Sequence, residues 1–284
     1  MKKITAIIIN FNTPETTLKA INELRRHARD FAFDLILIDN NSAKKIALTE
    51  LKDFKFQYIQ NHENLGFAKA VNQGIRMAQS EYVLLLNSDC FVQEHSLESM
   101  LNFLSINLDT AVLGPKIRYP DGQTQPSFGY LPTVRRLIFK IFQIGKIWPL
   151  GTLVHRNALT EKYFRTARET EWVSGACMLV RKNVFAEVGL FDEAYFFGFE
   201  DIDFCCRIRQ AGYKVVFLPT AKVIHYHGFS SGGKRSLFSL QNEANGMRYF
   251  YKKNWPEKKI GLIVVNLLYA FKLSYTRIWQ SIIK

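Results

Sequence analysis

The sequence predicts an α/β protein built on a doubly wound, mostly parallel sheet flanked by helices. Three observations support this class. Short, unbroken apolar runs recur along residues 1–90, and such runs are typical of strands buried on both faces. Segments with helical signals separate the runs, as strand–helix–strand units require. The chain has 284 residues, of which 48% are hydrophobic, so we expect one large domain with a substantial core.

The individual elements follow from local signals. Four strands are predicted from the apolar runs at residues 5–9, 35–38, 56–59 and 82–86. A helix is expected to begin at Thr13-Pro14-Glu15, because proline is favoured in the first turn, and a second is expected to run through Met77. A later helix is expected to end at Gly212, since glycine commonly follows a helix C-terminus.

Polar side chains follow the first, second and fourth of these strands. They are Asn10 and Asn12, residues 39–42, and residues 87–89. In doubly wound sheets, ligands bind beyond the carboxyl ends of the strands. Turn formation alone enriches Asn and Asp at strand ends, but three such ends on one edge favour a ligand site.

The class of ligand is narrowed by two motifs that the sequence lacks. No GxGxxG follows the first strand and no Walker lysine loop is present, which argues against nicotinamide dehydrogenases and P-loop NTPases. A diphosphate would then be held by a divalent cation, for which Asp89 is a suitable hard oxygen ligand. Asn87 stands where a second carboxylate could have strengthened that site.

A second feature is an acidic cluster. Glu200, Asp201 and Asp203 place three carboxylates in four positions, ahead of the helix that ends at Gly212. Like charges this close repel, and a cation, a basic partner or a proton-transfer task can explain them. Negative side chains are also favoured in the first turn of a helix. The cluster alone therefore leaves capping and catalysis equally open.

Charge and cysteine content limit the partners. The net charge of +13 indicates an anionic partner, which could be nucleic acid, an anionic membrane or a phosphorylated small molecule. The four cysteines form no CxxC pair and are expected to be reduced core thiols. Met1-Lys2-Lys3 leads directly into a strand, so no signal peptide and a cytoplasmic protein are expected.

Taken in order, the motifs of the chain resemble family 2 glycosyltransferases, most closely the rhamnosyltransferase-like branch, over residues 4 to 230. The motifs that carry the resemblance are Ile7-Ile8-Ile9-Asn10-Phe11-Asn12, Ile38-Asp39-Asn40-Asn41-Ser42, Asn64-Leu65-Gly66-Phe67-Ala68, Asn72-Gln73-Gly74, Leu86-Asn87-Ser88-Asp89, Trp172-Val173-Ser174-Gly175-Ala176, Gly189-Leu190-Phe191-Asp192-Glu193, Phe199-Glu200-Asp201-Ile202-Asp203 and Val223-Ile224-His225. The resemblance implies a GT-A fold that transfers a sugar from a nucleotide-diphosphate donor with inversion.

The resemblance also implies roles for individual residues. Those implied to bind the donor are Asn12, Asp39, Asn41, Asn64, Gly66, Asn72, Asn87 and Ser88. Asp89 and His225 are implied to hold a divalent metal, Mg²⁺ or Mn²⁺, with His227 as the alternative histidine. The implied general base is Asp201, with Glu200 as fallback. Asp203 is expected to be structural and paired with Arg207, and Trp172 and Gly175 to line the acceptor side.

The chain is expected to divide into a GT-A domain at residues 1–236 and a helical C-terminal segment at 237–284. Within the first, residues 119–170 are a variable basic and aromatic insertion or lid. In the second, the apolar run 260–271 is shorter than the ~20 residues of a spanning helix. Lysines flank it, which favours an interfacial membrane helix. A plain packing helix or a dimer contact stays open.

The function expected from the whole sequence is an inverting glycosyltransferase of surface-polysaccharide biosynthesis. Rhamnose from dTDP-rhamnose is the first expectation for the donor, and a glycan or lipid-linked oligosaccharide for the acceptor. We expect the enzyme at the inner face of the plasma membrane, on an anionic surface, with no nucleic acid as partner. A sugar nucleotidyltransferase, or a non-catalytic basic protein that binds nucleic acid or membranes, is the alternative.

Overall fold

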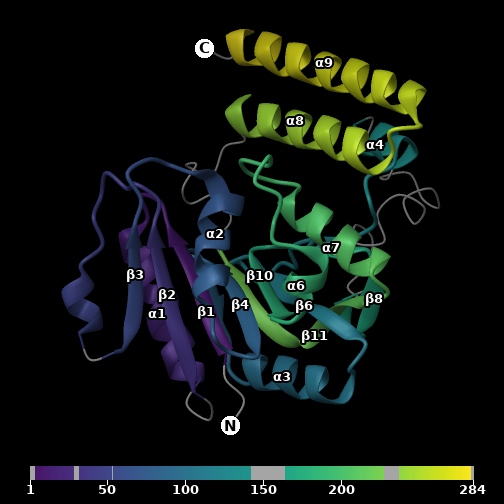
Figure 1. The fold of residues 1–284 in the computed structure, drawn as a ribbon. Coiled ribbons are helices and arrows are strands. Elements are labelled where there is room, and N and C mark those ends of the chain that lie inside the picture. Colours follow the sequence, from purple (N-terminus) through teal and green to yellow (C-terminus); the bar gives the residue numbers. More distant parts are fainter. Residues whose placement is uncertain (1–3, 29–31, 53, 142–163, 227–236, 283–284) are drawn as a thin grey trace.

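The computed structural model describes residues 4–28, 32–52, 54–141, 164–226 and 237–282. A central sheet lies between two layers of helices, and two long helices, α8 (Leu237–Asn254) and α9 (Lys259–Ile282), stack at one end (Figure 1). The predicted α/β class with a helical C-terminal segment is confirmed. Part of the predicted insertion at 119–170, namely residues 142–163, lies outside the described residues.

The remaining elements of the described chain are as follows. The strands are β1 (Ile4–Asn10), β2 (Phe33–Asp39), β3 (Phe56–Gln60), β4 (Tyr82–Asn87), β5 (Cys90–Val92), β6 (Thr110–Arg118), β7 (Phe128–Gly129), β8 (Arg168–Thr170), β9 (Trp172–Val173), β10 (Cys177–Arg181) and β11 (Lys214–His225). The helices are α1 (Pro14–His27), a 3-10 turn (Leu48–Leu51), α2 (Gly66–Met77), α3 (Ser96–Ile106), α4 (Val134–Ile141), α6 (Val184–Val188) and α7 (Glu200–Gln210).

The sheet has a parallel half and a mixed half. Its strand order is β3-β2-β1-β4-β10-β6-β11-β5, with β8 also paired to β11. The four strands predicted from apolar runs form the parallel half. In the other half β10 is antiparallel to β4 and β6, and β11 is parallel to β6 but antiparallel to β5 and β8.

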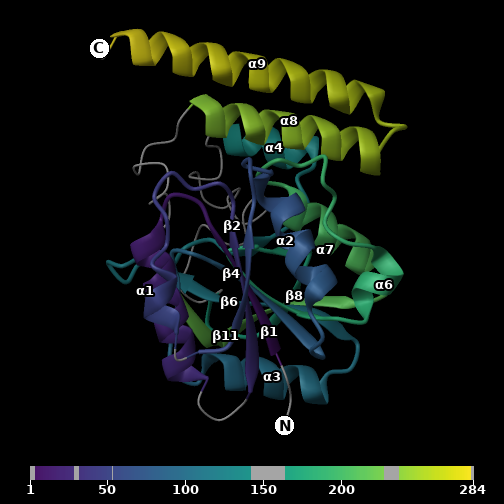
Figure 2. The same cartoon turned by 60° about the vertical axis from the view of Figure 1, so that its left-hand side comes forward.

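Two hydrophobic cores hold the helices against the sheet. On one face, α1 and α3 contribute Leu24 and Leu101 to the core. On the other face, α2, α6 and α7 contribute Val71, Phe185 and Phe204. Figure 2 shows the sheet between these two layers, with α1 on one side and α2, α6 and α7 on the other. Burial on both faces explains why β1 and β4 are continuous apolar runs.

Strand register brings the polar strand ends to one edge of the sheet, which we call the rim. Asn10 pairs with Asp39, which in turn pairs with Gln60. β10 starts at this edge, since Cys177 lies opposite Leu86 at the end of β4. β11 ends there, with His225 opposite Cys90. Sequence-distant segments therefore meet where the parallel strands end.

The C-terminal helices pack on the rest of the protein through α4 and α7. Met247 of α8, Val265 and Tyr269 of α9 and Leu137 of α4 share a small core. A Cβ on Gly246 of α8 would lie 3.1 Å from the backbone oxygen of Gly198, just before α7. This close approach joins α8 to the start of α7. Within the described part of the chain, no helix combines the length and apolar character needed to cross a membrane.

Candidate active site

The buried carboxylate of Asp39 organises the first part of the rim. It accepts hydrogen bonds from the Asn10 side chain (2.7 Å), the Ser42 backbone N–H (2.7 Å) and the Gln60 side chain (2.9 Å). Burial alone would raise the pKa of Asp39, but these hydrogen bonds outweigh it and the pKa is lowered. Asp39 is thus an ionised anchor with no exposed surface, whereas the resemblance implied direct contact with the donor.

The exposed part of this rim is formed by Asn12 and Asn41. Both lie in left-handed backbone conformations, with φ of 59° and 63°, which asparagine adopts more readily than most residues. The side-chain oxygen of Asn12 accepts a hydrogen bond from the Ala43 N–H at 2.7 Å. Both residues are exposed, so they are able to meet a ligand above Asp39.

Asn64 and Gly66 join the rim to the loop before α7. The Asn64 side-chain oxygen accepts bonds from Asn40 (2.8 Å) and from the Gly66 N–H (3.0 Å). A Cβ on Gly66 would lie 2.4 Å from the Phe196 backbone oxygen, and φ there is +77°, so this contact requires glycine.

Asn72 is placed away from the open rim. It is buried, and its amide donates to the Phe191 carbonyl (2.8 Å) and to Glu193 (2.9 Å). Its oxygen accepts from the Phe191 N–H at 3.1 Å. Asn72 therefore holds the loop at residues 190–193, whereas the resemblance implied a donor contact.

Asn87 and Ser88 connect β4 with its neighbours. The Asn87 N–H donates to the Ala176 carbonyl at 2.9 Å, and the Ser88 hydroxyl lies 2.9 Å from the Thr13 hydroxyl. Both residues are half-buried. They place Asp89, the next residue, at the end of the rim.

Asp89, Cys90 and His225 form a candidate metal site, with ligand atoms within 4.8 Å of one another. His225 Nε2 lies 3.2 Å from Asp89 Oδ1, and Nδ1 lies 3.0 Å from the Gln125 side-chain oxygen. That oxygen accepts only, so it selects the tautomer with hydrogen on Nδ1. Nε2 and the Asp89 carboxylate face each other, so a ring nitrogen and a carboxylate oxygen are available together to a cation.

Cys90, the third member of the group, suits a metal less well than Asp89 and His225. Burial raises the pKa of the Cys90 thiol well above its usual value, and the thiolate is the form that binds metals. Cys90 belongs to the hydrophobic core on one face of the sheet. Asp89 and His225 therefore fit a divalent cation, in a set that Gln125 orients from behind. His227 lies outside the described residues.

The acidic cluster begins α7, as the sequence indicated. Asp201 Oδ2 accepts a hydrogen bond from the Gly175 N–H at 3.0 Å. Since the Asn87 N–H binds the next residue, Ala176, Asp201 is tied to the end of β4. Burial raises the pKa of Asp201, and its hydrogen bonds with the backbone of Gly175 and Ile202 oppose the increase.

Glu200 differs from Asp201 although it is adjacent in sequence. It is 5% exposed, and among the described residues its Oε2 atom has no hydrogen-bond partner. Burial, and then the charge of Asp201, raise the pKa of Glu200 to about 8. Near neutral pH Glu200 therefore holds a proton, and Asp201, which is partly exposed, is the carboxylate available to a ligand.

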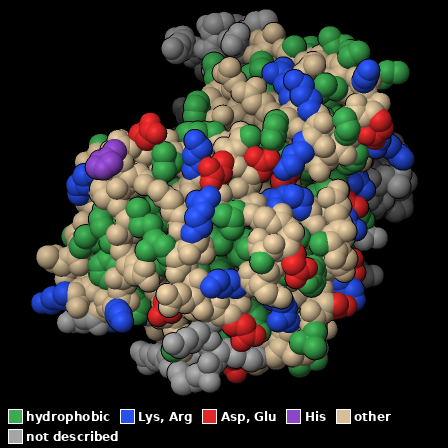
Figure 3. Space-filling model, viewed as in Figure 1, with side chains coloured by type: hydrophobic (Ala, Val, Ile, Leu, Met, Phe, Trp, Pro, Cys, Tyr) green, Lys and Arg blue, Asp and Glu red, His purple; other side chains and the backbone are tan. Residues whose placement is uncertain are grey.

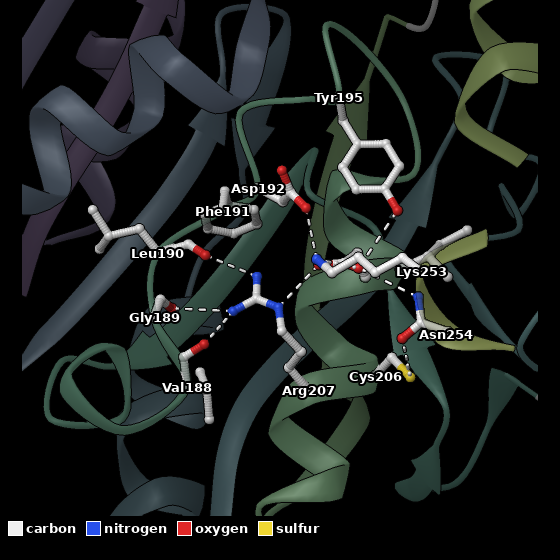
Figure 4. Close-up of polar contacts among 12 residues, drawn as sticks. Val188, Gly189, Leu190, Phe191, Asp192, Tyr195, Cys206, Arg207, Lys253 and Asn254 are labelled. Atoms are coloured by element: carbon white, nitrogen blue, oxygen red, sulfur yellow. Dashed lines mark hydrogen bonds and ion pairs between the residues drawn. The ribbon is translucent and has the colours of Figure 1, made fainter. Parts of the chain in front are cut away.

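Asp203 has no exposed surface and two cationic partners. Arg207 Nε and Lys253 Nζ each lie 2.9 Å from its carboxylate. Figure 4 shows the Arg207 guanidinium pointing into the loop at residues 188–190 and Lys253 reaching the same region from α8. The expected Asp203–Arg207 pair is present, and Asp203 is structural.

Gly175 lies beside Asp201, and Trp172 lies three residues earlier, in β9. A Cβ on Gly175 would lie 3.5 Å from the Asp201 Cβ and 3.7 Å from the Phe67 ring, so the wall is closely packed here. Trp172 is half-buried, and its indole N–H donates to the Tyr130 carbonyl at 3.0 Å. This hydrogen bond fixes the orientation of the Trp172 ring.

Three participants were missed by reasoning from the sequence. Gln125, which orients His225, lies in the region that was expected to be a variable insertion. Asn40, quoted only within its motif, links Asn64 to the rim. Lys253 was interpreted as a basic flank of the C-terminal helix, but it is paired with Asp192 and Asp203. Of these three residues, only Asn40 could have been found from the sequence, because it lies in an Asn-rich strand end.

We predict that Glu200 makes stability depend on pH. The pKa is about 8 in the folded protein against 4.5 ordinarily, so folding favours the protonated form. Its contribution is full below about pH 4.5 and is lost as pH rises through about 8. The Tm measured by thermal unfolding should decline from pH 5 to pH 8. In Glu200→Gln this decline should be smaller by about 3 °C or more.

The matched control is Glu63→Gln, because Glu63 is an exposed carboxylate on the same side of the sheet ends. This control should leave the pH dependence of Tm unchanged. Parallel curves for Glu200→Gln and the unsubstituted protein would contradict a protonated Glu200.

Comparison with known proteins identifies the family. The family model described as Glycosyl transferase family 2 matches residues 5–189. A curated N-acetylglucosaminyl-diphospho-decaprenol L-rhamnosyltransferase of Mycobacterium tuberculosis is 31% identical over 212 residues, covering 70% of this chain and 68% of that protein. The dTDP-rhamnosyl transferase RfbF of Shigella flexneri is 25% identical, covering 80% of this chain and 70% of that protein.

Solved structures agree at the level of the fold. GalNAc-T7 with UDP, GalNAc and Mn²⁺ gives a TM-score of 0.61 at 19% identity, covering 92% of this chain and 51% of that one. The mannosyltransferase PcManGT of Pyrobaculum calidifontis, with GDP-Man and Mn²⁺, gives 0.59 at 12% identity, covering 93% and 69%. The fold is GT-A, as expected. The chain is a glycosyltransferase of family 2, similar to its rhamnosyltransferase branch.

Proposed function

We propose that this glycosyltransferase inverts the anomeric centre and uses Asp201 as general base. The observation that carries the proposal is the place of Asp201: the Gly175 N–H holds its carboxylate at the rim that also carries Asp89 and His225. The raised pKa of Asp201 makes it a stronger base than an ordinary aspartate. Family membership leaves the nucleotidyltransferase and nucleic-acid alternatives without a supporting observation.

In the proposed step one proton moves, one bond to the anomeric carbon forms and another bond to that carbon breaks. Asp201 takes the proton of an acceptor hydroxyl while that oxygen attacks the anomeric carbon. The bond from this carbon to the diphosphate breaks, and its electron pair leaves with the diphosphate on the opposite face. Because Glu200 is protonated, it adds no second negative charge beside Asp201. The first turn of α7 thereby supplies a single reactive carboxylate.

We further propose that Asp89 and His225 hold a divalent cation together with the donor diphosphate. Carboxylate and phosphate oxygens suit Mg²⁺ or Mn²⁺, which commonly bind through one or two carboxylates plus substrate phosphates. When bound, such a cation stabilises negative charge on the leaving diphosphate. Asn87, the last residue of β4, and Ser88, which follows it, precede Asp89 in the chain and would face the same group.

For the donor we propose dTDP-rhamnose, with its nucleoside against Asn12 and Asn41. Asp39 and Asn72 hold the surrounding loops, and Asn64 and Gly66 fix the segment beside them. The donor is suggested by the name of the Shigella flexneri relative. The name of the Mycobacterium tuberculosis relative suggests a lipid-linked acceptor. This acceptor would enter from the side of Gly175 and Trp172. The reaction would then belong to the assembly of a surface polysaccharide.

A lipid-linked acceptor is compatible with the outer face of α9, which we propose to lie on an anionic membrane. Its large apolar side chains recur every three or four residues and are between 57% and 78% exposed: Ile260, Ile263, Leu267, Phe271 and Tyr275. At helical spacing they share one face. No charged residue interrupts residues 260–271. The enzyme would then act peripherally at the cytoplasmic face of the plasma membrane.

Charge favours a bilayer over a second copy of the chain as the partner of this face. Lys258 and Lys259 are exposed where α9 begins, and Figure 3 shows Lys and Arg among hydrophobic side chains over α8 and α9. Anionic headgroups attract such lysines, whereas a second copy would bring more positive charge. Two lysines counted as flanks from the sequence are engaged inside the protein: Lys253 with Asp192, and Lys272 with Glu243.

The first test is donor turnover across a panel of nucleotide sugars with Mg²⁺, with Mn²⁺ and with chelator. We expect one donor to be turned over only when metal is present, and this turnover to be lost in Asp89→Ala. The control Asp121→Ala changes an exposed aspartate in a turn and should behave like the unsubstituted enzyme. Binding of no donor, or full turnover in chelator, would contradict the site.

The base is tested by Asp201→Asn, which keeps the shape of the side chain but cannot take the proton. We expect kcat to fall by ~10²–10⁴ while calorimetry shows donor binding within about twofold of the original, because Asp201 faces the acceptor. Glu200→Gln should lose much less activity. If Glu200→Gln proves the more damaging change, the base is Glu200.

The membrane face is tested with a Leu267→Ser/Phe271→Ser variant and vesicle sedimentation. Because burial of a large apolar side chain contributes about 1.5–3 kcal/mol, binding to phosphatidylglycerol-containing vesicles should weaken by about tenfold or more. The control Ile106→Ser/Leu108→Ser alters apolar residues that are 80% and 74% exposed near α3, at the opposite end of the molecule (Figure 1). Unchanged vesicle binding, or loss of a dimer in sedimentation velocity, would refute the membrane assignment.

A further inference from the structure

We propose that Lys253, on α8, is a positioning residue that sets the place of Asp201. The inference rests on the proposed role of Asp201 as base, and it assigns to the C-terminal helices a part in the active site. α7 and α8 both lie beyond residues 5–189, the part of the chain that the family model matches.

Lys253 bridges two carboxylates from different segments. Its Nζ atom lies 2.7 Å from Asp192 Oδ2 and 2.9 Å from the carboxylate of Asp203. Asp203 is wholly buried, and the side chains of Asp192 and Lys253 are 20% and 29% exposed. The Tyr249 hydroxyl, one turn earlier on α8, donates to Asp192 at 3.1 Å. Figure 4 shows Lys253 directed toward Asp192.

The two carboxylates belong to the supports of the proposed base. Asp203 lies in the first turn of α7, two residues after Asp201. Asp192 lies in the loop whose neighbours Phe191 and Glu193 are held by Asn72 of α2. Lys253 therefore fastens the start of α7 and this loop to α8, and through the loop to α2, at whose first turn Phe67 approaches Gly175.

Arg207 supports α7 from the opposite direction. It binds Asp203 through Nε at 2.9 Å and donates to the Leu190 carbonyl at 2.8 Å. Asp203 thus lies between a cation of its own helix and a cation of α8. Without Lys253, the first turn would lose its ionic link to α8, and of the polar contacts from that helix Asp203 would keep the longer one with the Asn254 amide, at 3.5 Å.

Lys253 stays charged in this position. Burial alone would lower its pKa, but the hydrogen bonds with Asp192 and Asp203 raise it above the usual value. It therefore offsets part of the negative charge that Asp201 and Asp203 gather at the start of α7. Because the Gly175 contact of Asp201 depends on where that turn lies, a small shift of the turn would misplace the base.

The test compares Lys253→Met, Lys253→Arg and the control Lys252→Met in the full chain. Lys252 is the exposed neighbour of Lys253 on α8, and its substitution removes the same charge from the helix. Steady-state kinetics would give kcat and the donor KM, and hydrogen exchange would report the amides of residues 199–205. Asp192→Asn, which weakens the same bridge with little change in volume, serves as a second variant.

We expect Lys253→Met to lower kcat about 10- to 100-fold, since misplacement of a reactive group by about 1 Å has an effect of this order. The donor KM should change less than about twofold, exchange at residues 199–205 should accelerate, and Lys253→Arg should restore most of kcat. Asp192→Asn should shift kcat and exchange in the same direction. Lys252→Met should change neither.

The proposal is overturned if exchange at residues 199–205 is the same in Lys253→Met and the unsubstituted protein, or if Lys252→Met has an equal effect. It is also overturned if Lys253→Met lowers Tm and changes kcat and the donor KM together, and Lys253→Arg restores none of these values. Absence of turnover in the unsubstituted protein would refute the proposed function instead, and the exchange measurement would still decide whether Lys253 fixes α7.

Discussion

The buried carboxylate of Asp203 is the group on which the order of the site depends. A charge removed from water must be paired and hydrogen-bonded, and here the partners come from α7 itself through Arg207 and from α8 through Lys253. Through these ion pairs, the loop at residues 188–193 and the C-terminal helices are held against the start of α7. The same turn carries Glu200 and Asp201, so the arrangement that satisfies Asp203 also positions them.

The other carboxylates of the rim are accommodated in different ways, and the differences separate their roles. Asp39 is stabilised as an anion by hydrogen bonds from the protein, and so it organises the strand ends. Glu200 has no such donor for its Oε2 atom among the described residues and keeps a proton. Asp201 has a backbone donor in Gly175 and is partly exposed. Environment, not residue type, distinguishes the anchor, the neutral neighbour and the proposed base.

The C-terminal helices face in two directions. The inner side of α8 meets Phe199 and the acidic residues of the site, with Gly246 allowing close approach. The outer side of α9 carries the exposed apolar row that we assign to a membrane. One pair of helices would thus join the proposed membrane surface, where a lipid-linked acceptor would lie, to the turn that carries the proposed base. Such an arrangement would account for the apolar and basic residues of this segment.

The sequence by itself determined the strands of the parallel half, the start and end of α7 and the ordered motifs of the family, because these depend on local apolar runs, helix signals and residue identity. Only the tertiary structure decided which polar groups are exposed at the rim and which are hydrogen-bonded within the protein. Asp39 and Asn72 are buried by contacts with Gln60 and Phe191, Gln125 reaches His225 from 100 residues away, and Lys253 pairs with Asp203 across 50. These contacts join residues distant in the chain, so burial and hydrogen bonding there depend on packing that no local pattern encodes.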